Sequence, residues 1–386
     1  MNQRVRSVRE RKYLFFYTFL SDYTMLRSGR KIRELSDMIR KMKVLRKISR
    51  SYIGYKLGHP IPFFCVYSVT LRCNLRCKHC FVESPYQNDK ELREYWSRLG
   101  RDLTTEQAKY AIDQLDRLGI SMLHLTGGEP LLREDLEEIA LYAKGKNMYV
   151  SLDTNGTLIT KERAKTLRYC FDRIGVSVDG MKETHDRIRG KNTFEKAVKA
   201  IKLLKNYSDS VVGIVYTINK INYRDVEEVF ELARAHCDFI TFLPIDHIRE
   251  LSLDEESAKR VGKKILKLKE KNMHFIENPV EYIKLLPYFL QGKTAIDCNI
   301  ACHPFALYYT LGPSGDLSGC TALHSFVGNI LKEDIVDMHR RGLSKMQDVR
   351  RKCKGCTLTC AIQNSLLFQQ PIHKAIFIAL PKLLLI

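Results

Sequence analysis

Short apolar runs and amphipathic stretches alternate in a regular order between residues 60 and 245. The apolar runs have the length and composition of strands and cover residues 63–70, 121–126, 148–153, 173–178, 211–217 and 239–243. Between them, apolar residues recur at helical spacing over residues 105–118, 135–143, 161–168, 194–204 and 225–235. Strands joined by helices favour a parallel sheet with right-handed crossovers. The six units therefore predict an α/β fold, a partial (β/α)6 TIM-like barrel shorter than the eight-fold one.

Local signals sharpen several of these boundaries. Thr104-Thr-Glu-Gln107 forms a capping box pattern that opens the first of these helices, and Gly119 marks its end. Residues 254–271 predict a further, strongly cationic helix. Pro313-Ser-Gly-Asp316 predicts the turn of a β-hairpin.

The two ends of the chain follow another pattern. Residues 1–56 hold 16 Lys or Arg and four acidic residues, so they carry +12 of the net charge of +20. Their apolar residues recur at helical spacing, which predicts a basic amphipathic helical leader over residues 1–58. Such a leader binds an anionic membrane surface, follows a nucleic-acid backbone or packs on the rest of the chain, and the sequence leaves these alternatives open.

The C-terminal segment, residues 366–386, is a predicted apolar tail. Its apolar run is only about 12 residues long and is interrupted by Pro381 and Lys382. It is too short to span a bilayer as a helix. The alternatives are a cap on the core and a contact with a membrane interface.

Composition places the chain among globular proteins. Hydrophobic residues make up 45% of its 386 residues and charged residues 28%. Twelve cysteines without a secretory signal indicate a reducing compartment, where clustered cysteines hold metal more often than they form disulfides. We therefore expect a cytoplasmic protein, with peripheral association to the cytoplasmic membrane face as an alternative. Cys65, Cys170 and Cys237 fall within strand or helix patterns and are expected to be core residues.

Three cysteines lie directly after the first predicted strand. Cys73, Cys77 and Cys80 fall within eight residues, with no fourth cysteine nearby. A structural zinc site usually takes four ligands as two separated pairs, whereas three thiolates on one loop suit a [4Fe–4S] cluster with one open iron. A zinc knuckle or a chance group of cysteines is the alternative.

Further polar motifs stand where other predicted strands end. The second strand runs into Gly127-Gly128-Glu129-Pro130, whose glycines allow close approach to a ligand and whose carboxylate can accept from an ammonium group. Asn155, Ser177 and Asp179 follow or end the next strands. Because active sites of such barrels gather at the C-terminal strand ends, we expect these residues to meet there.

Together these motifs resemble the radical S-adenosylmethionine (SAM) superfamily. The CxxxCxxC loop with an aromatic residue, His79, before the last cysteine is similar to the signature of that family, and the GGEP motif follows in the family's order. The resemblance implies that Cys73, Cys77 and Cys80 ligate the catalytic [4Fe–4S] cluster. It also implies a SAM site, and the residues it assigns to that site are His79, Gly127, Gly128, Glu129, Pro130, Asn155, Ser177 and Asp179.

A second group of cysteines lies in the last quarter of the chain and comprises Cys298, Cys302, Cys320, Cys353, Cys356 and Cys360. The Gly315xxxxCys320 ending resembles the SPASM and twitch domains, which hold auxiliary [4Fe–4S] clusters. The resemblance implies domains at residues 59–285 and 286–365, the barrel and a small auxiliary-cluster domain. The pattern departs from the two-cluster family, because Cys356 is followed by only three residues and then Cys360, with no cysteine afterwards.

Six thiolates cannot complete two four-cysteine shells. We therefore expect at least one auxiliary [4Fe–4S] cluster. A second cluster with an open or non-cysteine ligand, or zinc in the Cys353–Cys356 region, remains an alternative.

The resemblance implies a radical SAM enzyme. In that family an electron from an external flavodoxin- or ferredoxin-like donor cleaves SAM reductively to a 5′-deoxyadenosyl radical, which abstracts hydrogen from the substrate. Peptide or protein modification is the expected outcome. The alternatives are radical modification of a lipid or polyprenyl at a membrane, modification of RNA, and a non-catalytic Fe–S protein.

Overall fold

The computed structural model describes residues 36–80, 101–246, 248–320, 325–353 and 355–371. The predictions for residues 1–35 and 372–386 lie outside this part of the chain. Among the described residues no helix combines the length and the apolar character needed to cross a membrane.

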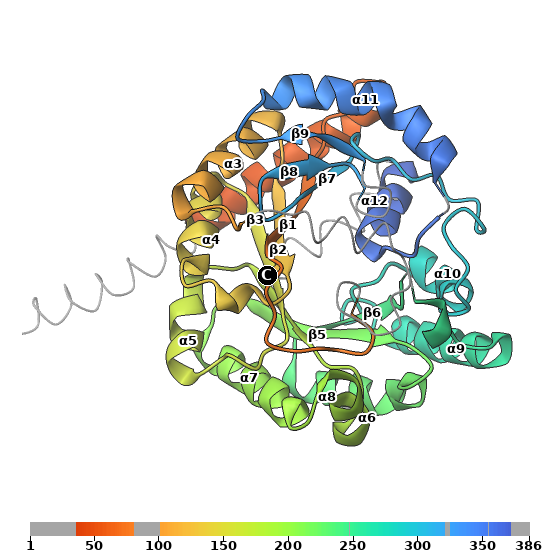
Figure 1. The fold of residues 1–386 in the computed structure, drawn as a ribbon. Helices are drawn as coiled ribbons and strands as arrows, with labels where there is room; N and C mark the ends of the chain where they lie inside the picture. The colour runs from red at the N-terminus through yellow and green to blue at the C-terminus, as the bar shows by residue number, and fades with distance from the viewer. Residues whose placement is uncertain (1–35, 81–100, 247, 321–324, 354, 372–386) are drawn as a thin grey trace, which may run out of the picture.

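The described strands form one open, nine-stranded sheet in the order β6-β5-β4-β3-β2-β1-β7-β8-β9. Its first six strands are parallel neighbours in chain order, which confirms the predicted partial barrel. They are β1 (Phe64–Thr70), β2 (Met122–Gly127), β3 (Tyr149–Thr154), β4 (Arg173–Ser177), β5 (Val211–Ile218) and β6 (Phe239–Pro244). Figure 1 shows this sheet curving inside a ring of helices.

The C-terminal part of the chain adds three strands to the free edge of β1. Strand β7 (Tyr308–Leu311) pairs with β1 in parallel, and β8 (Asp316–Ser318) and β9 (Phe326–Asn329) follow antiparallel. The predicted hairpin turn joins β7 to β8, where the amide of Gly315 donates to the carbonyl of Gly312. The sheet therefore runs without a break from the barrel into the cysteine-rich region.

Helices cover the convex side of the sheet, where Cys65 and Cys170 are buried as predicted. The expected ones are α3 (Thr105–Leu118), α4 (Leu136–Gly145), α5 (Lys161–Thr166), α7 (Thr193–Tyr207), α8 (Val226–His236) and α9 (Glu255–Lys271). The capping box of Thr104 and Gln107 is present at α3, and Gly119 ends this helix in a left-handed conformation.

Four further helices were not predicted: α6 (Lys182–Arg189), α10 (Val280–Leu290), α11 (Ile335–Lys352) and α12 (Thr359–Gln369). The described residues also form short 3-10 turns, which are η1 (Pro130–Leu132), η2 (Leu167–Tyr169), η3 (Tyr223–Asp225) and η4 (Arg249–Leu251).

Residues 36–56 are helical and lie across the N-terminal ends of the first strands. Val44, Ile48 and Tyr52 are buried in a cluster with Phe63 and Phe368. Arg40 adds an ion pair with the buried Asp172, which precedes β4. This half of the leader therefore packs on the rest of the chain, which was one of the alternatives that the sequence left open.

Candidate functional site

The three-cysteine loop begins where β1 ends. Cys77 is buried, and Cys73 and Cys80 are partly buried. The loop is tied down by main-chain hydrogen bonds, because the amide of Lys78 donates to the carbonyl of Ile188 at 2.9 Å. Cys80 is held in a turn, its amide donating to the carbonyl of Cys77 at 3.0 Å. The thiols thus stand on a loop whose path is set by the neighbouring helix α6.

The glycine-rich turn after β2 packs directly against this loop. The amide of Gly128 donates to the carbonyl of Thr70, and that of Glu129 to the carbonyl of Arg72, both at 2.8 Å. A Cβ atom on Gly127 would lie 2.0 Å from the oxygen of Thr70, and one on Gly128 2.3 Å from the oxygen of Arg72. The close approach that requires these glycines is therefore between two segments of the main chain, whereas the sequence suggested an approach to a ligand.

Glu129 joins the end of β2 to the end of β3. Its buried carboxylate accepts hydrogen bonds from the hydroxyl of Thr154 at 2.7 Å and from the amides of Asn155 at 2.8 Å and Leu131 at 3.1 Å. Burial raises the pKa of this carboxyl above its ordinary value, although these donors oppose the rise. Pro130, the last residue of the motif, is buried beside it. Both carboxylate oxygens of Glu129 therefore accept hydrogen bonds from the protein, and this residue holds the ends of β2 and β3 together.

Asn155 connects this arrangement back to the cysteine loop. Its side-chain amide donates to Oδ1 of Asn74 at 2.9 Å, and Asn74 in turn donates to the hydroxyl of Thr157 at 2.9 Å. Asn74 lies between Cys73 and Cys77. The sequence analysis gave Asn74 no role, and its position inside the CxxxC spacing was the signal that could have suggested one.

A buried ion pair supports the loop from the side of β4. Asp179 is fully buried and pairs with Arg189, the last residue of α6. His79 lies 3.5 Å from Asp179, and burial lowers the pKa of His79 to about 4. Burial alone would raise the pKa of Asp179, but Arg189 and His79 outweigh it and keep this pKa below its ordinary value. Ser177, the last residue of β4, precedes Asp179 by two positions and is partly exposed.

Arg189 is a second residue to which the sequence analysis assigned no role. Burial raises the pKa of the Cys77 thiol to about 11, and the guanidinium of Arg189 opposes this rise. Because cluster ligands must be thiolates, a buried cation beside the cysteines favours the form that binds iron. Three soft thiols, one buried cation and an anchored loop fit a [4Fe–4S] cluster. Among the described residues, no three His, Cys, Asp or Glu side chains form a group suited to a single metal ion.

The inner face of the sheet carries an ionic network that the sequence analysis did not single out. His124 on β2 lies 2.9 Å from the hydroxyl of Ser151 and 3.4 Å from Asp153, both on β3. Arg173 joins Asp153 to Glu277, each at 2.9 Å. The alternation of polar and apolar residues along these strands could have indicated the network, since its side chains share the face opposite the helices.

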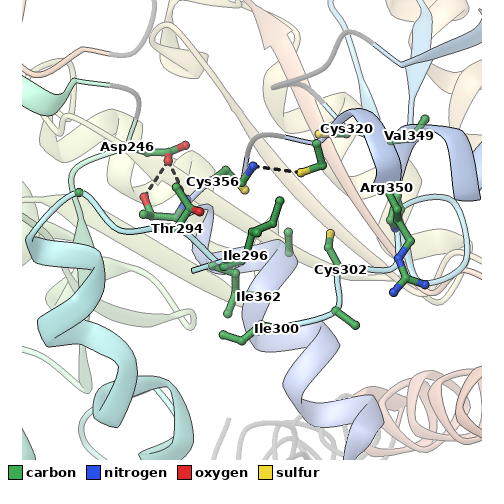
Figure 2. Close-up of a pocket in the computed structure, with 18 of the residues that line it drawn as sticks. Asp246, Thr294, Ile296, Ile300, Cys302, Cys320, Val349, Arg350, Cys356 and Ile362 are labelled. Atoms are coloured by element: carbon green, nitrogen blue, oxygen red, sulfur yellow. Dashed lines mark hydrogen bonds between the residues drawn. The ribbon is translucent and has the colours of Figure 1, made fainter. Parts of the chain in front are cut away.

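A second site surrounds a cavity of about 840 Å³ in the C-terminal region. Its lining includes Cys302, Cys320, Cys353 and Cys356. Figure 2 labels Cys302, Cys320 and Cys356 beside the cavity, with Asp246 at its far side. Cys302 lies 3.1 Å from the hydroxyl of Tyr308, the first residue of β7. Burial raises the pKa of Cys302 and of Cys356, the latter well above its ordinary value.

The other two cysteines of this group are not among the described residues that line the cavity, although Cys360 lies close enough to Cys302 for the two thiols to interact electrostatically. Within the described lining neither Cys298 nor Cys360 contributes to the wall. Cys360 is the second residue of α12, and burial raises its pKa to about 11. Four thiols around one cavity match the ligand number of a single closed [4Fe–4S] cluster.

Comparison with known proteins identifies one domain of the chain. Residues 67–233 match the radical SAM superfamily, and they span the cysteine loop, the glycine-rich turn and strands β2 to β5. The chain contains a radical SAM domain. A domain of this superfamily implies a [4Fe–4S] cluster and SAM as cofactors.

Curated relatives match less than half of this chain. Fe-coproporphyrin III synthase of Methanosarcina barkeri is 39% identical over 169 residues, which cover 43% of this chain and 40% of that protein. Mycofactocin maturase MftC of Mycolicibacterium smegmatis is 30% identical over 188 residues, covering 48% of this chain and 45% of that protein. The chain thus spans less than half the length of these relatives.

Solved structures extend the likeness beyond the barrel. SuiB of Streptococcus suis, bound to precursor peptide SuiA, superimposes with a TM-score of 0.59 at 14% identity. The match covers 83% of this chain and 76% of SuiB. At this identity the likeness shows the fold alone, and its coverage extends beyond the barrel.

Proposed function

We propose that the protein is a radical SAM enzyme that modifies a peptide or protein. One observation carries the proposal: the CxxxCxxC loop is locked against the glycine-rich turn at the C-terminal end of parallel strands, where barrels of this kind place their active sites. Cys73, Cys77 and Cys80 would hold the catalytic cluster. When bound, the cluster and SAM supply a reductive cleavage that begins hydrogen abstraction from the substrate.

The chain's own residues position these cofactors. Asn74 and Asn155 fix the cysteine loop relative to the end of β3, and Glu129 fixes that end relative to β2. Arg189 favours the thiolate form of Cys77, and Asp179 holds Arg189 in place. By family resemblance, the carbonyls of the Gly127–Pro130 turn and the side chains of Asn155, Ser177 and His79 would contact SAM.

Cys302, Cys320, Cys353 and Cys356 would hold one auxiliary [4Fe–4S] cluster. The support for this assignment is that these four thiols line one cavity. A cluster with four thiolate ligands has no open iron, so its role would be electron transfer or organisation of the fold rather than substrate binding. An external flavodoxin- or ferredoxin-like protein would supply the electrons.

A peptide substrate is supported by the likeness to SuiB, which was solved with the precursor peptide SuiA bound, and to the maturase MftC. A second candidate is an iron tetrapyrrole, because the 39% identical relative is named Fe-coproporphyrin III synthase. The two curated relatives each match less than half of this chain, so these two candidates need a direct test.

The first experiment asks whether the radical chemistry exists. Anaerobically reconstituted protein is analysed for iron and sulfide, and 5′-deoxyadenosine is measured after addition of SAM and dithionite. We expect about eight irons per chain, and about four with no SAM cleavage in the Cys73→Ala/Cys77→Ala/Cys80→Ala variant. Cys237→Ala, which removes a thiol at the end of α8, is the matched control and should behave as wild type. Clusters without SAM cleavage would support the Fe–S carrier instead.

The second experiment separates the two substrate classes. Fe-coproporphyrin III is titrated into the reconstituted protein under anaerobic conditions, and its Soret band is followed. A saturable shift would favour a tetrapyrrole site; because Fe-coproporphyrin III is the named product of that relative, faster formation of 5′-deoxyadenosine is not required of it. No shift, with acceleration by a peptide encoded beside the gene, would support peptide modification.

A further inference from the structure

The helix formed by residues 36–56 has two faces of different character. Val44, Ile48 and Tyr52 are buried against the ends of the strands. The opposite face exposes apolar side chains: Met38 is 51% exposed, Met42 62% and Ile53 49%. Ile39 and Leu57, the residue after the helix, are also exposed. Five of the 13 large hydrophobic side chains exposed in the described structure thus lie in this one segment.

The same exposed face is strongly basic. Lys43, Arg46 and Arg50 are exposed beside the apolar residues. With about 100° of rotation per residue, all of these side chains fall within an arc of roughly 140°. Asp37 is the only acidic residue between positions 36 and 57, and it is paired with Arg40 and Lys41. The face therefore combines exposed apolar groups with positive charges that form no ion pair with the acidic residues of the described structure.

We propose that this face of residues 36–57 docks on an anionic lipid bilayer. Apolar side chains flanked by Lys and Arg are the composition with which an interfacial helix enters the headgroup region, and each basic residue near an anionic surface adds to binding. A nucleic-acid backbone would contact the Lys and Arg side chains of this face but would leave Met38, Met42 and Ile53 exposed to water. The inference is independent of the radical chemistry proposed above.

The fold gives this docking surface a fixed orientation relative to the cysteine loop. The helix crosses the end of the sheet where the strands begin: the hydroxyl of Ser51 donates to the carbonyl of Ile61, Arg40 donates to the carbonyl of Met148, and Lys47 pairs with Asp116. Figure 1 shows it in red and orange behind the sheet. Cys73, Cys77 and Cys80 follow the other end of β1, about 20 Å away for a strand of this length. Docking would therefore turn the cysteine loop away from the bilayer and toward soluble substrates.

The C-terminal segment leaves the described structure beside the same helix. The hydroxyl of Tyr52 donates to the carbonyl of Gln370, and Phe368 packs on Tyr52 and Phe63. The apolar sequence Ala375–Ile386 follows directly in the chain. The two segments for which the sequence left a membrane interface as one alternative are therefore continuous with this part of the molecule.

The test measures sedimentation of the full-length protein with vesicles of phosphatidylglycerol and phosphatidylcholine in equal parts, and with vesicles of phosphatidylcholine alone. We expect binding to the anionic vesicles. The variant Lys43→Gln/Arg46→Gln/Arg50→Gln should weaken it on the order of a hundredfold. The variant Met38→Ser/Met42→Ser/Ile53→Ser/Leu57→Ser should weaken it at least about tenfold.

A matched control removes the same charge elsewhere. Lys263→Gln/Lys267→Gln/Lys271→Gln alters exposed lysines of α9, a helix without exposed large apolar residues, and should bind as wild type. Circular dichroism verifies that every variant is folded. Hydrogen exchange adds a local readout, since vesicles should slow exchange in residues 36–57 and leave residues 70–80 unchanged.

Three results would overturn the proposal. The first is vesicle binding that the serine variant does not weaken. The second is salt-dependent binding of transfer RNA with no binding to vesicles. The third is a dimer that the serine variant dissociates, in a protein that does not sediment with vesicles.

Discussion

At the scale of single residues, the site depends on buried polar groups whose partners are other parts of the protein. Glu129, Asn155 and Asp179 were expected to contact SAM, and each has protein partners at the ends of the strands. Such groups are costly to leave unpaired in the interior. Their contribution to function would therefore include positioning the cysteine loop as well as any contact with a ligand.

Replacing Glu129 by Gln tests this role. The side-chain amide of Gln would face the amide N–H of Asn155, so a buried hydrogen bond would be lost. We expect the free energy of unfolding to fall by about 1–3 kcal/mol, measured by urea unfolding of the apoprotein. Glu134→Gln changes an exposed carboxylate in the same segment and should be neutral. Equal stability of the two variants would contradict the role given to Glu129.

His185 provides a prediction about pH. Its Nδ1 accepts from the amide of Asp179 at 3.1 Å, and burial lowers its pKa to about 4 from an ordinary value of 6.5. Between these values the unfolded chain binds the additional proton, so the full contribution to stability is present above pH 6.5 and is lost as the pH falls toward 4. His79 and His303 shift in the same direction.

The variant His185→Asn keeps an acceptor near the Nδ1 position and has no proton to bind. Between pH 7.5 and pH 5, we expect wild type to lose about 1–2 kcal/mol more stability than the variant. Urea unfolding of both apoproteins at the two pH values measures this difference. An identical loss in both proteins would show that His185 is not buried in its neutral form.

At the scale of elements, the loop after β1 and the turn after β2 pack against each other. The turn after β2 and the loop after β1 pair through their main chains, and side chains are absent from positions 127 and 128 because the oxygens of Thr70, Leu71 and Arg72 occupy that space. The GGEP turn is thus part of the support for the cysteine loop. A substitution in the turn should therefore shift the position of the cysteines.

The variant Gly128→Ala should displace the cysteine loop. Its Cβ would meet the carbonyl oxygens of Leu71 and Arg72 at 2.5 and 2.3 Å, and main-chain atoms cannot move aside cheaply. We expect a loss of about 1–3 kcal/mol in stability and a fall from about eight to about four irons after reconstitution. Gly145→Ala, where a Cβ meets nothing within 4 Å, should retain full iron. Full iron in both variants would refute the coupling.

At the scale of the whole molecule, the parallel pairing of β1 with β7 brings the second cysteine group against the barrel. Cys302 precedes β7 and Cys320 follows β8, so the hairpin between them presents both thiols to one cavity. Cys353 and Cys356 reach the same cavity after α11. The assembly predicts which of the six cysteines hold the auxiliary cluster.

Cys320→Ala should lose the auxiliary cluster and keep the catalytic one. Iron analysis should give about four irons per chain, and electron paramagnetic resonance of the reduced protein should retain the signal that SAM perturbs. Cys298→Ala is the control, because Cys298 lies outside the described lining of the cavity. Equal iron loss in both variants would reject the four-cysteine assignment.

The periodicities were sufficient to predict the six barrel strands and most of their helices, because a buried strand and an amphipathic helix differ in local pattern. Two of the four helices that were not predicted are hard to recognise from their local sequence. Helix α6 is short and almost entirely polar, and α10 contains Pro287, which normally argues against a helix. Their formation depends on packing against the rest of the chain.

The cysteine spacing and the order of motifs, both local, were likewise enough to indicate the family. Only the tertiary structure decided which atoms surround the cysteines. Asn74, Arg189 and the network of His124 and Asp153 depend on contacts between distant segments, which spacing along the chain does not encode. For the same reason, the leader could be predicted as basic and amphipathic from its sequence, whereas the face it buries is set by the strand ends on which residues 36–56 pack.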